Sequence, residues 1–382
     1  MVAPANRLDQ VKEYYFSVKL REIEALNKSG LPVINLGIGS PDLAPDNTVI
    51  ATLAEEAAKS TTHAYQPYKG GALLRDAFAT WYKNYFRVEL NSETEVLPLL
   101  GSKEGIVYTT MAFVGAGDKV LVPDPGYPAY RAATLLAGAE CEFYNLTAKN
   151  NWLPDIAELE KRDLSKVKLM WINYPNMPTG VKANKQVLEE LVVFARKHNI
   201  LLINDNPYSF ILNTDLTSLL QVSGAKEDCL ELNSLSKSHN MAGWRVGVIT
   251  GNATALQSIL QFKSNIDSGM FYPVQAAAAQ ALSLGNDWFT KQNEIYERRR
   301  SLVWQLLDKL DCKYSKDQCG LFVWASIPTK YETGFQLSDE ILQRWRVFIT
   351  PGGIFGNNGN AYIRVSLCQS EEKMKEALER IG

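Results

Sequence analysis

The sequence has little of what a metal site, a disulfide framework or a membrane anchor requires. Its 382 residues include three histidines and five cysteines, with no C-x-x-C pair and no histidine spaced to complete a zinc site. No apolar run approaches the ~18 residues of a membrane span, and the N-terminal segment lacks the basic and then apolar pattern of a secretory signal. These absences predict a cytoplasmic protein with reduced thiols and no metal.

The sequence also lacks an excess of charge of either sign. The 40 basic and 42 acidic residues give a formal net charge of −2, so no overall field attracts nucleic acid or an anionic membrane. We therefore expect neither as a partner. Hydrophobic residues make up 46% and charged residues 21%, which is ordinary for a globular protein. A chain of this length can bury a large core and form two or three domains.

Short apolar runs alternate with helical patterns between about residues 95 and 250. Several runs are apolar throughout, which is typical of strands buried on both faces of a parallel sheet. The runs are VLPLL, KVLVP, KLMWIN, ILLIN, CLELNS and RVGVIT, and the helical candidates between them include 103–114, 127–137 and 184–197. This alternation predicts an α/β fold with a doubly wound, mostly parallel sheet.

The pattern changes after about residue 280. A charged helical pattern at 286–311 precedes the strand candidate LFVWASIP, a helix near 337–346, the strand candidate AYIRVSL and a final helix at 371–380. This order predicts a smaller α+β domain. We expect a large, cofactor-binding domain at 46–280, and a small domain formed by 281–382 together with an N-terminal arm at 1–45.

A lysine between hydroxyl residues is the first candidate for a catalytic residue. Lys237 follows the strand CLELNS within the sequence SLSK, and Arg245 lies eight residues later, where the next strand begins. Lysine is costly to bury unless it is paired or used chemically. Buried beside other cations, its pKa falls and the amine becomes nucleophilic. An exposed loop lysine is the alternative, and the flanking strand, serines and arginine favour the chemical role.

A carboxylate lies just past another apolar strand. Asp205 follows ILLIN, and Tyr208 lies three residues further on. Ligands of doubly wound sheets bind at the carboxyl ends of the strands. A carboxylate there suits a protonated pyridine nitrogen. A turn or N-cap aspartate is the alternative for this position.

Gly101, Ser102 and Lys103 separate the strand VLPLL from a helix. Exposed amides and the dipole at a helix N-terminus form a phosphate site, with a plain glycine turn as the alternative. The sequence has no G-x-G-x-x-G. The nearest candidate, GAGDKV at 115–120, leads from a helix into a strand, which is the wrong polarity for a dinucleotide fingerprint. A nicotinamide enzyme is therefore disfavoured.

Over nearly its whole length the chain resembles the class I/II aminotransferases, enzymes of fold type I that use pyridoxal 5'-phosphate. The resemblance rests on eight motifs in the order and spacing of that family. They are GIGSPD (37–42), YQPYKGG (65–71), GSKEG (101–105), DPGYPAY (124–130), NYPNMPTG (173–180), DNPY (205–208), SLSK…R (234–245) and YIRVSL (362–367).

The resemblance implies how the cofactor is held. Lys237 would carry it as a Schiff base, and Asp205 would pair with its pyridine nitrogen. Tyr208 would donate a hydrogen bond to its phenolic oxygen, and Tyr127 would stack on its ring. The implied phosphate-binding residues are Gly101, Ser102 and Lys103 through backbone amides, Ser234 and Ser236 through hydroxyls, and Arg245 through its guanidinium.

The resemblance also implies a substrate site and an assembly. Arg364 would clamp the substrate α-carboxylate, a task suited to a bidentate guanidinium. The backbone at Gly39 would close over the same carboxylate. Tyr65 would reach the cofactor phosphate of a neighbouring subunit, which implies a homodimer with shared active sites.

The chain departs from the family at one position. The family reads N-P-T-G, and its asparagine bonds the phenolic oxygen, whereas Met177 occupies that position here. Asn176, one residue earlier, is the candidate replacement, with a turn asparagine as the alternative. The three histidines (63, 198 and 239) match no catalytic role and are expected to be structural. Tyr14, Tyr15 and Phe16 are candidates for the substrate pocket, although packing of the arm on the small domain is favoured.

These residues predict an aminotransferase that moves an amino group between an α-amino acid and a 2-oxo acid, with Lys237 as the general base. β-Elimination of the C–S lyase type is the alternative, because both reactions begin with removal of the α-proton. A non-catalytic relative is disfavoured by retention of the lysine, the aspartate and both arginines. The segment 263–273 lacks the second arginine of dicarboxylate-specific relatives, and resembles diaminopimelate- and aspartate-type members.

Overall fold

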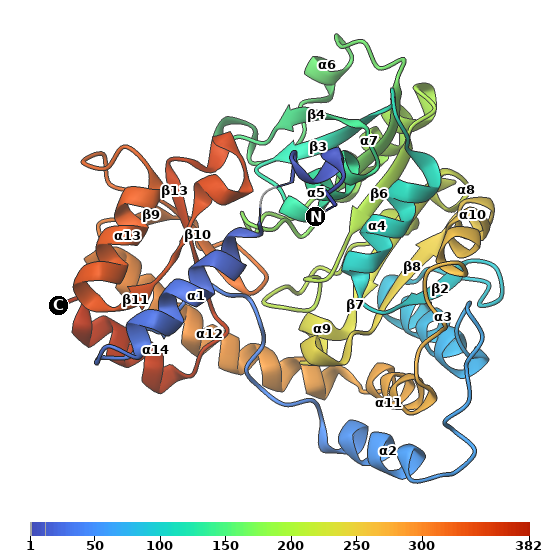
Figure 1. Cartoon of the computed structure of the whole chain (residues 1–382), viewed down its shortest axis with the longest axis horizontal. Coiled ribbons are helices and arrows are strands. Elements are labelled where there is room, and N and C mark those ends of the chain that lie inside the picture. Colours follow the sequence, from blue (N-terminus) through green and yellow to red (C-terminus); the bar gives the residue numbers. More distant parts are fainter. Residues whose placement is uncertain (1, 12) are drawn as a thin grey trace.

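The computed structural model describes residues 2–11 and 13–382, and its centre is a seven-stranded sheet (Figure 1). The strand order is β2-β8-β7-β6-β5-β3-β4, and β8 runs antiparallel to its two neighbours while the other pairs are parallel. The prediction of a mostly parallel α/β sheet is confirmed. The strand bounds are β2 (Val96–Leu99), β3 (Lys119–Asp124), β4 (Glu140–Asn145), β5 (Val167–Ile172), β6 (Leu201–Asp205), β7 (Cys229–Ser234) and β8 (Gly247–Gly251).

Alternate residues of the strands belong to two different hydrophobic clusters, one on each face of the sheet. Leu202 of β6 belongs to one cluster and the adjacent Ile203 to the other. The helices of one face are α4 (Ser102–Phe113), α5 (Pro128–Leu136) and α10 (Ala253–Lys263). On the other face lie α3 (Ala72–Phe86), α7 (Lys185–Lys197) and α11 (Tyr272–Leu282), and α2 (Asn47–Ala57) packs against α11. The short helices are α6 (Ile156–Leu159), α8 (Ala225–Asp228) and α9 (Leu235–Ser238).

The strand β4 is absent from the prediction. It carries Glu140, Cys141 and Glu142 and forms an edge of the sheet, where side chains remain partly exposed. An edge strand with charged residues lacks the continuous apolar signal of the central strands.

A second sheet of four antiparallel strands forms a smaller unit, with order β12-β13-β10-β9. Its strands are β9 (Lys313–Tyr314), β10 (Phe322–Ser326), β12 (Thr350–Pro351) and β13 (Tyr362–Ser366), and its helices are α13 (Gly334–Trp345) and α14 (Glu371–Arg380). The long α12 (Asn286–Lys309) runs from below the large sheet to α14 (Figure 1).

The N-terminal segment belongs with this smaller unit. The strand β1 (Ile34–Asn35) pairs in parallel with β11 (Val347–Phe348), and Ile23 of α1 (Tyr15–Asn27) packs with Leu342 and Phe348. We therefore propose a large domain at 46–280 and a small domain of 281–382 with the arm 1–45. Among residues 2–11 and 13–382, no helix has the length and hydropathy to cross a membrane.

Candidate active site

A cavity of about 470 Å³ lies at the carboxyl ends of the large-sheet strands, against the smaller unit. Its wall contains residues from β6, β7, α4 and α9 of the large sheet, and from β10 and β13 of the smaller one. Ligands of doubly wound sheets bind at this edge. The structure brings together most of the predicted site residues there: Gly39, Ser102, Lys103, Tyr127, Asp205, Tyr208, Ser234, Ser236, Lys237, Arg245 and Arg364.

Lys237 lies on the short α9 directly after β7, so its amine points into the cavity from the end of a central strand. Its Nζ donates a hydrogen bond to the carbonyl oxygen of Gly39 across 2.5 Å. Burial lowers the pKa of Lys237, and the positive charges of Arg364 and Arg245 act in the same direction. A lysine with a lowered pKa can supply a neutral amine for nucleophilic and base chemistry.

Asp205 ends β6 and presents a carboxylate with one unused oxygen. Its Oδ2 accepts a hydrogen bond of 2.8 Å from the Tyr130 hydroxyl, while its buried Oδ1 has no partner among the described residues. Burial raises the pKa of Asp205 to about 6. The Tyr130 ring stacks on Trp171 with centroids 5.1 Å apart, which fixes the donor. A buried acceptor of this kind fits a cationic ring N–H, and therefore a protonated pyridine nitrogen.

An anion cradle lies where α4 begins. Gly101 has φ of 94°, and a Cβ there would lie 2.1 Å from Nη2 of Arg245. A Cβ on Gly247 would lie 2.6 Å from the backbone nitrogen of Ser102. These close approaches leave the helix amides, Arg245 and the nearby serine hydroxyls around one space, which fits a phosphate group. Gly101 shapes this space although it does not line the cavity itself.

Two tyrosines form further walls of the cavity. Tyr127 precedes the first turn of α5 and meets Tyr130 edge-on, with ring centroids 5.7 Å apart. Tyr208 meets Phe322 of the smaller unit at 5.9 Å. Burial raises the pKa of both hydroxyls, so each stays protonated and able to donate a hydrogen bond at neutral pH.

Arg364 on β13 is a buried cation held by neutral groups. Its Nη2 donates to the carbonyl oxygen of Gly37 at 2.9 Å, its Nη1 lies 3.1 Å from Sδ of Met177, and its buried Nε has no described partner. The guanidinium carbon lies 3.7 Å from the ring centroid of Phe322. Burial lowers the pKa of Arg364 to about 10, which still leaves it charged at neutral pH. Such a cation favours a carboxylate ligand.

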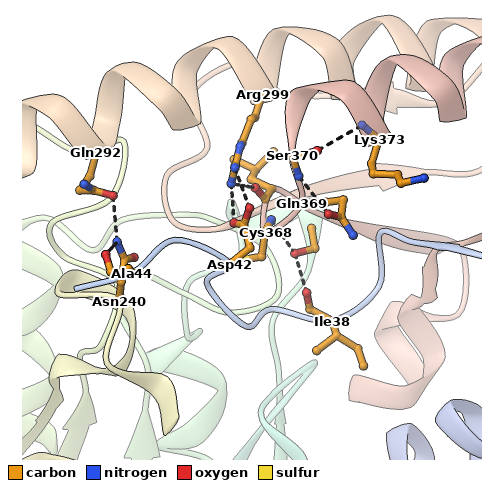
Figure 2. A network of polar contacts seen from close by, with 12 residues as sticks. Ile38, Asp42, Ala44, Asn240, Gln292, Arg299, Cys368, Gln369, Ser370 and Lys373 are labelled. Carbon is orange, nitrogen blue, oxygen red and sulfur yellow. Dashed lines mark hydrogen bonds and ion pairs between the residues drawn. The ribbon is translucent and has the colours of Figure 1, made fainter. Parts of the chain in front are cut away.

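The segment 37–46, here called the strap, crosses between the two units and is bound to both (Figure 2). On the side of the large unit, Nδ2 of Asn240 donates to the carbonyl oxygen of Ala44 at 3.2 Å. Arg299 of α12 binds both carboxylate oxygens of Asp42, at 2.7 and 2.8 Å. The Ser366 hydroxyl of β13 donates to the carbonyl oxygen of Ile38 at 2.8 Å. The strap therefore holds the Gly39 carbonyl at Lys237, a contact that sequence motifs alone did not reveal.

The N-terminal arm contributes to the cavity more than predicted. Tyr14 and Phe16 line it, and Nζ of Lys103 lies 5.0 Å from the Tyr14 ring centroid. The favoured prediction, packing on the small domain, holds for Tyr15, whose ring meets Phe335 at 6.1 Å. It holds also for Phe16, which lines the cavity and packs against the cluster that contains Leu342 and Phe348. Successive residues at the start of a helix point about 100° apart, so adjacent aromatic rings reach different surroundings.

Asn176 does not reach the cavity. Its Oδ1 accepts hydrogen bonds from the Thr179 hydroxyl and amide at 2.7 and 3.2 Å, and its Nδ2 donates to the carbonyl oxygen of Asn173 at 3.1 Å. The candidate replacement for the missing family asparagine is therefore a turn residue, and Asn173 and Met177 line the cavity instead. The direction of the Asn176 side chain could not be predicted from spacing alone, because the turn's own hydrogen bonds decide it.

The remaining candidates lie outside the cavity. Tyr65 is 90% exposed in the single chain. His63 lies against Phe271, and His198 lies 3.1 Å from a Glu160 oxygen. Burial lowers the pKa of His239 to about 3, so this ring stays neutral. None of the three histidines lines the cavity.

The mostly parallel sheet, with a buried lysine, a buried aspartate and an anion cradle in the cavity at the carboxyl ends of its strands, fits the class of fold type I pyridoxal phosphate enzymes. Within that class, residues 32–381 match the model of the family described as aminotransferase class I and II, and the chain belongs to this family.

Similar proteins agree with this assignment. The chain is 38% identical over 380 residues to an LL-diaminopimelate aminotransferase of Dehalococcoides mccartyi, covering 99% of this chain and 98% of that protein. It is 39% identical over 379 residues to the enzyme of the same name from Moorella thermoacetica, covering 99% and 97%. The substrate-bound BacF structure from Bacillus subtilis has a TM-score of 0.94 at 35% identity, covering 100% and 97%. A Thermus thermophilus aspartate aminotransferase mutant, at 24% identity, shares the fold with a TM-score of 0.92, covering 100% and 99%.

The predicted activity and cofactor are confirmed by these findings. The chain is an enzyme of the transaminase type, uses pyridoxal 5'-phosphate, and acts on amino and oxo acids. The β-elimination alternative is not favoured, because the similar proteins are named aminotransferases.

Proposed function

We propose that Lys237, Asp205 and Arg364 carry the aminotransfer reaction in the cavity described above. The supporting observation is that these three groups face one space while each keeps bonding capacity for a ligand. Bound pyridoxal phosphate supplies an aldehyde that condenses with amines and a ring that withdraws electrons from the substrate α-carbon.

The protein's own groups divide the work of holding this cofactor. The free Oδ1 of Asp205 would accept the hydrogen of the ring nitrogen and keep it protonated. Tyr208 would donate its hydroxyl hydrogen to the phenolic oxygen, and Tyr127 would cover one ring face. The anion cradle would take the phosphate through the amides of Ser102 and Lys103, the hydroxyls of Ser234 and Ser236, and Arg245.

Lys237 is proposed as the group that moves the proton. Burial lowers the pKa of Lys237, which favours the neutral form of its amine, and that amine can remove a proton from the substrate α-carbon and return it to a different carbon. Arg364 would hold the α-carboxylate and so fix which substrate atom meets the amine. Gly39 and Phe322 close that side of the cavity against water.

The amino donor is proposed to be LL-diaminopimelate, by which the similar proteins are named. Lys103 supports this proposal, because its ammonium group is a cation in the cavity wall beyond those given roles above and suits a second carboxylate. The cavity is also lined by the apolar Phe16, Leu20 and Phe355, which favours an aromatic amino acid as the second candidate. Single-turnover absorbance with a panel of donors separates them, and equal rates for LL-diaminopimelate and alanine would contradict the first proposal.

A homodimer with shared active sites is also proposed. Tyr65 and the exposed Tyr68 lie in the loop before α3, and the exposed Leu73 lies in the first turn of that helix. The exposed Ile266 and Phe271 lie in the segment between α10 and α11. The two segments are joined by the buried Lys263, whose Nζ donates to the carbonyl oxygen of Tyr68 and to Asp267. Exposed apolar groups gathered this way favour a protein interface. Sedimentation velocity would test the assembly.

A cytoplasmic location is the remaining proposal. The five cysteines are free thiols, and four of them are buried. Unpaired thiols are typical of the cytoplasm, where disulfides are rare. Cell fractionation with a tagged chain would test the location.

A further inference from the structure

Met177 lies against the buried guanidinium of Arg364. Its Sδ is 3.1 Å from Nη1, and the side chain is 5% exposed where it lines the cavity. The Met177 backbone is fixed in turn, because its amide donates to Oδ1 of Asn173 at 2.7 Å. Asn173 itself donates to the carbonyl oxygen of Asp205. The thioether is therefore held in place from the end of β6.

Arg364 has few other contacts that could orient it. Nη2 of Arg364 donates a hydrogen bond to the carbonyl oxygen of Gly37. The guanidinium carbon lies 3.7, 4.6 and 5.8 Å from the ring centroids of Phe322, Phe355 and Phe16. Ring faces attract a cation without fixing the direction of its N–H groups. No acidic side chain of residues 2–11 and 13–382 forms an ion pair with Arg364. Two neutral acceptors, one carbonyl and one thioether, are left to set the orientation.

We propose that Met177 is a positioning residue of the carboxylate site: its thioether orients Nη1 of Arg364 and leaves the positive charge uncompensated for the substrate. A carboxylate in its place would orient the arginine equally well but would neutralise it and repel the substrate. A sulfur acceptor is weak and uncharged, so it directs the N–H without competing for the charge. This proposal rests on the proposed role of Arg364 in binding the α-carboxylate.

The alternative is that Met177 is packing only, since methionine is a common filler of irregular cores. Two substitutions separate the readings because they keep the bonded position of the sulfur. In methionine, leucine and asparagine, the atoms Sδ, Cδ1 and Oδ1 are each bonded to Cγ. Met177→Leu therefore puts carbon where the acceptor was, while conserving volume. Met177→Asn puts an oxygen acceptor there and loses apolar volume.

The test measures carboxylate binding by the holoenzyme, with 3-phenylpropionate as probe and 3-phenylpropionamide as its uncharged match. Binding is followed by titration calorimetry, because the family's asparagine at this position bonds the phenolic oxygen and Met177→Asn would itself alter the visible absorbance of the cofactor. Met177→Leu is expected to weaken probe binding about three- to tenfold, the scale of one modest hydrogen bond to a charged group. It should leave the amide unaffected, and raise KM for amino donors more than it lowers kcat. Met177→Asn should bind the probe within about twofold of the wild-type chain.

The outcomes distinguish the two proposals. Unchanged probe binding in Met177→Leu would overturn the positioning role, and so would equal losses in the leucine and asparagine variants, because packing then explains both. If Met177→Leu fails to fold, the asparagine variant alone decides, since a loss of probe binding there contradicts the role. Arg364→Ala is measured beside them. Unchanged probe binding in Arg364→Ala would instead remove the proposed carboxylate site itself.

Discussion

The Lys237 amine donates to the carbonyl oxygen of Gly39 across 2.5 Å, although 198 residues separate the two in the chain. The lysine belongs to α9 of the large sheet, and the glycine belongs to the strap fixed on the smaller unit. The proposed catalytic amine is therefore held by a backbone carbonyl and has no carboxylate partner among residues 2–11 and 13–382, which fits a group whose pKa is lowered and not raised.

The first prediction concerns which lysine holds the cofactor. Lys237→Ala is expected to lose covalent attachment and transamination, because no other lysine has its buried position at the end of β7. Borohydride reduction of the holoenzyme followed by peptide mass spectrometry should place the cofactor on Lys237. Lys103→Ala is the matched variant, since it removes another amine of the same cavity and keeps the backbone amide. Label on Lys103 in the wild-type chain would contradict the assignment.

The second prediction concerns Arg364. Arg364→Ala should weaken transition-state binding by on the order of 2–4 kcal/mol, because one charge-assisted bidentate contact is lost. Cofactor affinity should survive, since the residue lies on β13, away from the anion cradle. Steady-state kcat/KM over several α-amino acids and fluorescence titration of the cofactor measure the two effects. A fall in cofactor affinity without loss of kcat/KM would assign the arginine to the other site.

The third prediction uses the raised pKa of Asp205 in the cofactor-free protein. Because the folded pKa is about 6 and the ordinary value 3.8, the native state binds the proton more tightly than the unfolded chain. The contribution of Asp205 to the unfolding free energy therefore falls as pH rises from about 4 through 6, and is lost above about pH 7. Asp205→Asn removes this ionisation, so its stability relative to wild type should grow by about 1 kcal/mol between pH 5 and 7.5.

Urea denaturation of both cofactor-free proteins at the two pH values measures that difference. Any pH-independent cost of placing an asparagine there cancels between the two conditions. A relative stability that is equal at pH 5 and 7.5 would show that the carboxylate is ionised without penalty in the folded protein. The same variant should bind pyridoxal phosphate more weakly, since it lacks the negative charge for the ring nitrogen.

The fourth prediction tests the shared active site. Tyr65→Phe should weaken cofactor binding by roughly 0.5–3 kcal/mol, the range for one hydrogen bond to a charged group. In a heterodimer of a Tyr65→Phe chain and a Lys237→Ala chain, the single site with a lysine would receive an intact tyrosine from its neighbour. Activity for each working site should then equal that of wild type.

The neighbouring exposed tyrosine provides the control for this experiment. Tyr68→Phe, combined in the same way, should leave cofactor affinity unchanged in homodimer and heterodimer alike. If the working site of the Tyr65 heterodimer behaves like the Tyr65→Phe homodimer, the hydroxyl acts within its own chain.

The sequence predicted the central strands, Asp205 and Lys237 because each has a strong local signal. Gly39, Tyr127 and Arg364 were predicted from the resemblance to the family. Strands such as β6 and β7 are continuously apolar, and the polar residues directly after them must meet at one edge of the sheet. The charged edge strand β4 carries no such signal. Asp205 was predicted, whereas its partner Tyr130 was not, because a helix residue on α5 meets β6 only through the packing of the sheet.

Side-chain direction at irregular backbone was the harder problem. Asn176 and Met177 are adjacent. Hydrogen bonds within the turn decide that the Asn176 side chain points to Thr179 of the same turn, while the Met177 side chain points to Arg364. At the start of α1, Tyr14 and Tyr15 are equally plausible wall residues by composition. The rotation of the helix about its axis directs Tyr14 to the cavity and Tyr15 to Phe335 of the smaller unit, and that rotation is set by the packing of the whole fold.

The strap connects the proposed carboxylate site at Arg364 with the proposed catalytic amine of Lys237. Arg364 and the strap are both anchored to the smaller unit, through β13 and through the Asp42–Arg299 pair, whereas Lys237 is anchored to the large sheet. The Gly39 carbonyl and the Arg364 guanidinium therefore share one support, so that a shift of the smaller unit relative to the sheet would change the position of both with respect to Lys237.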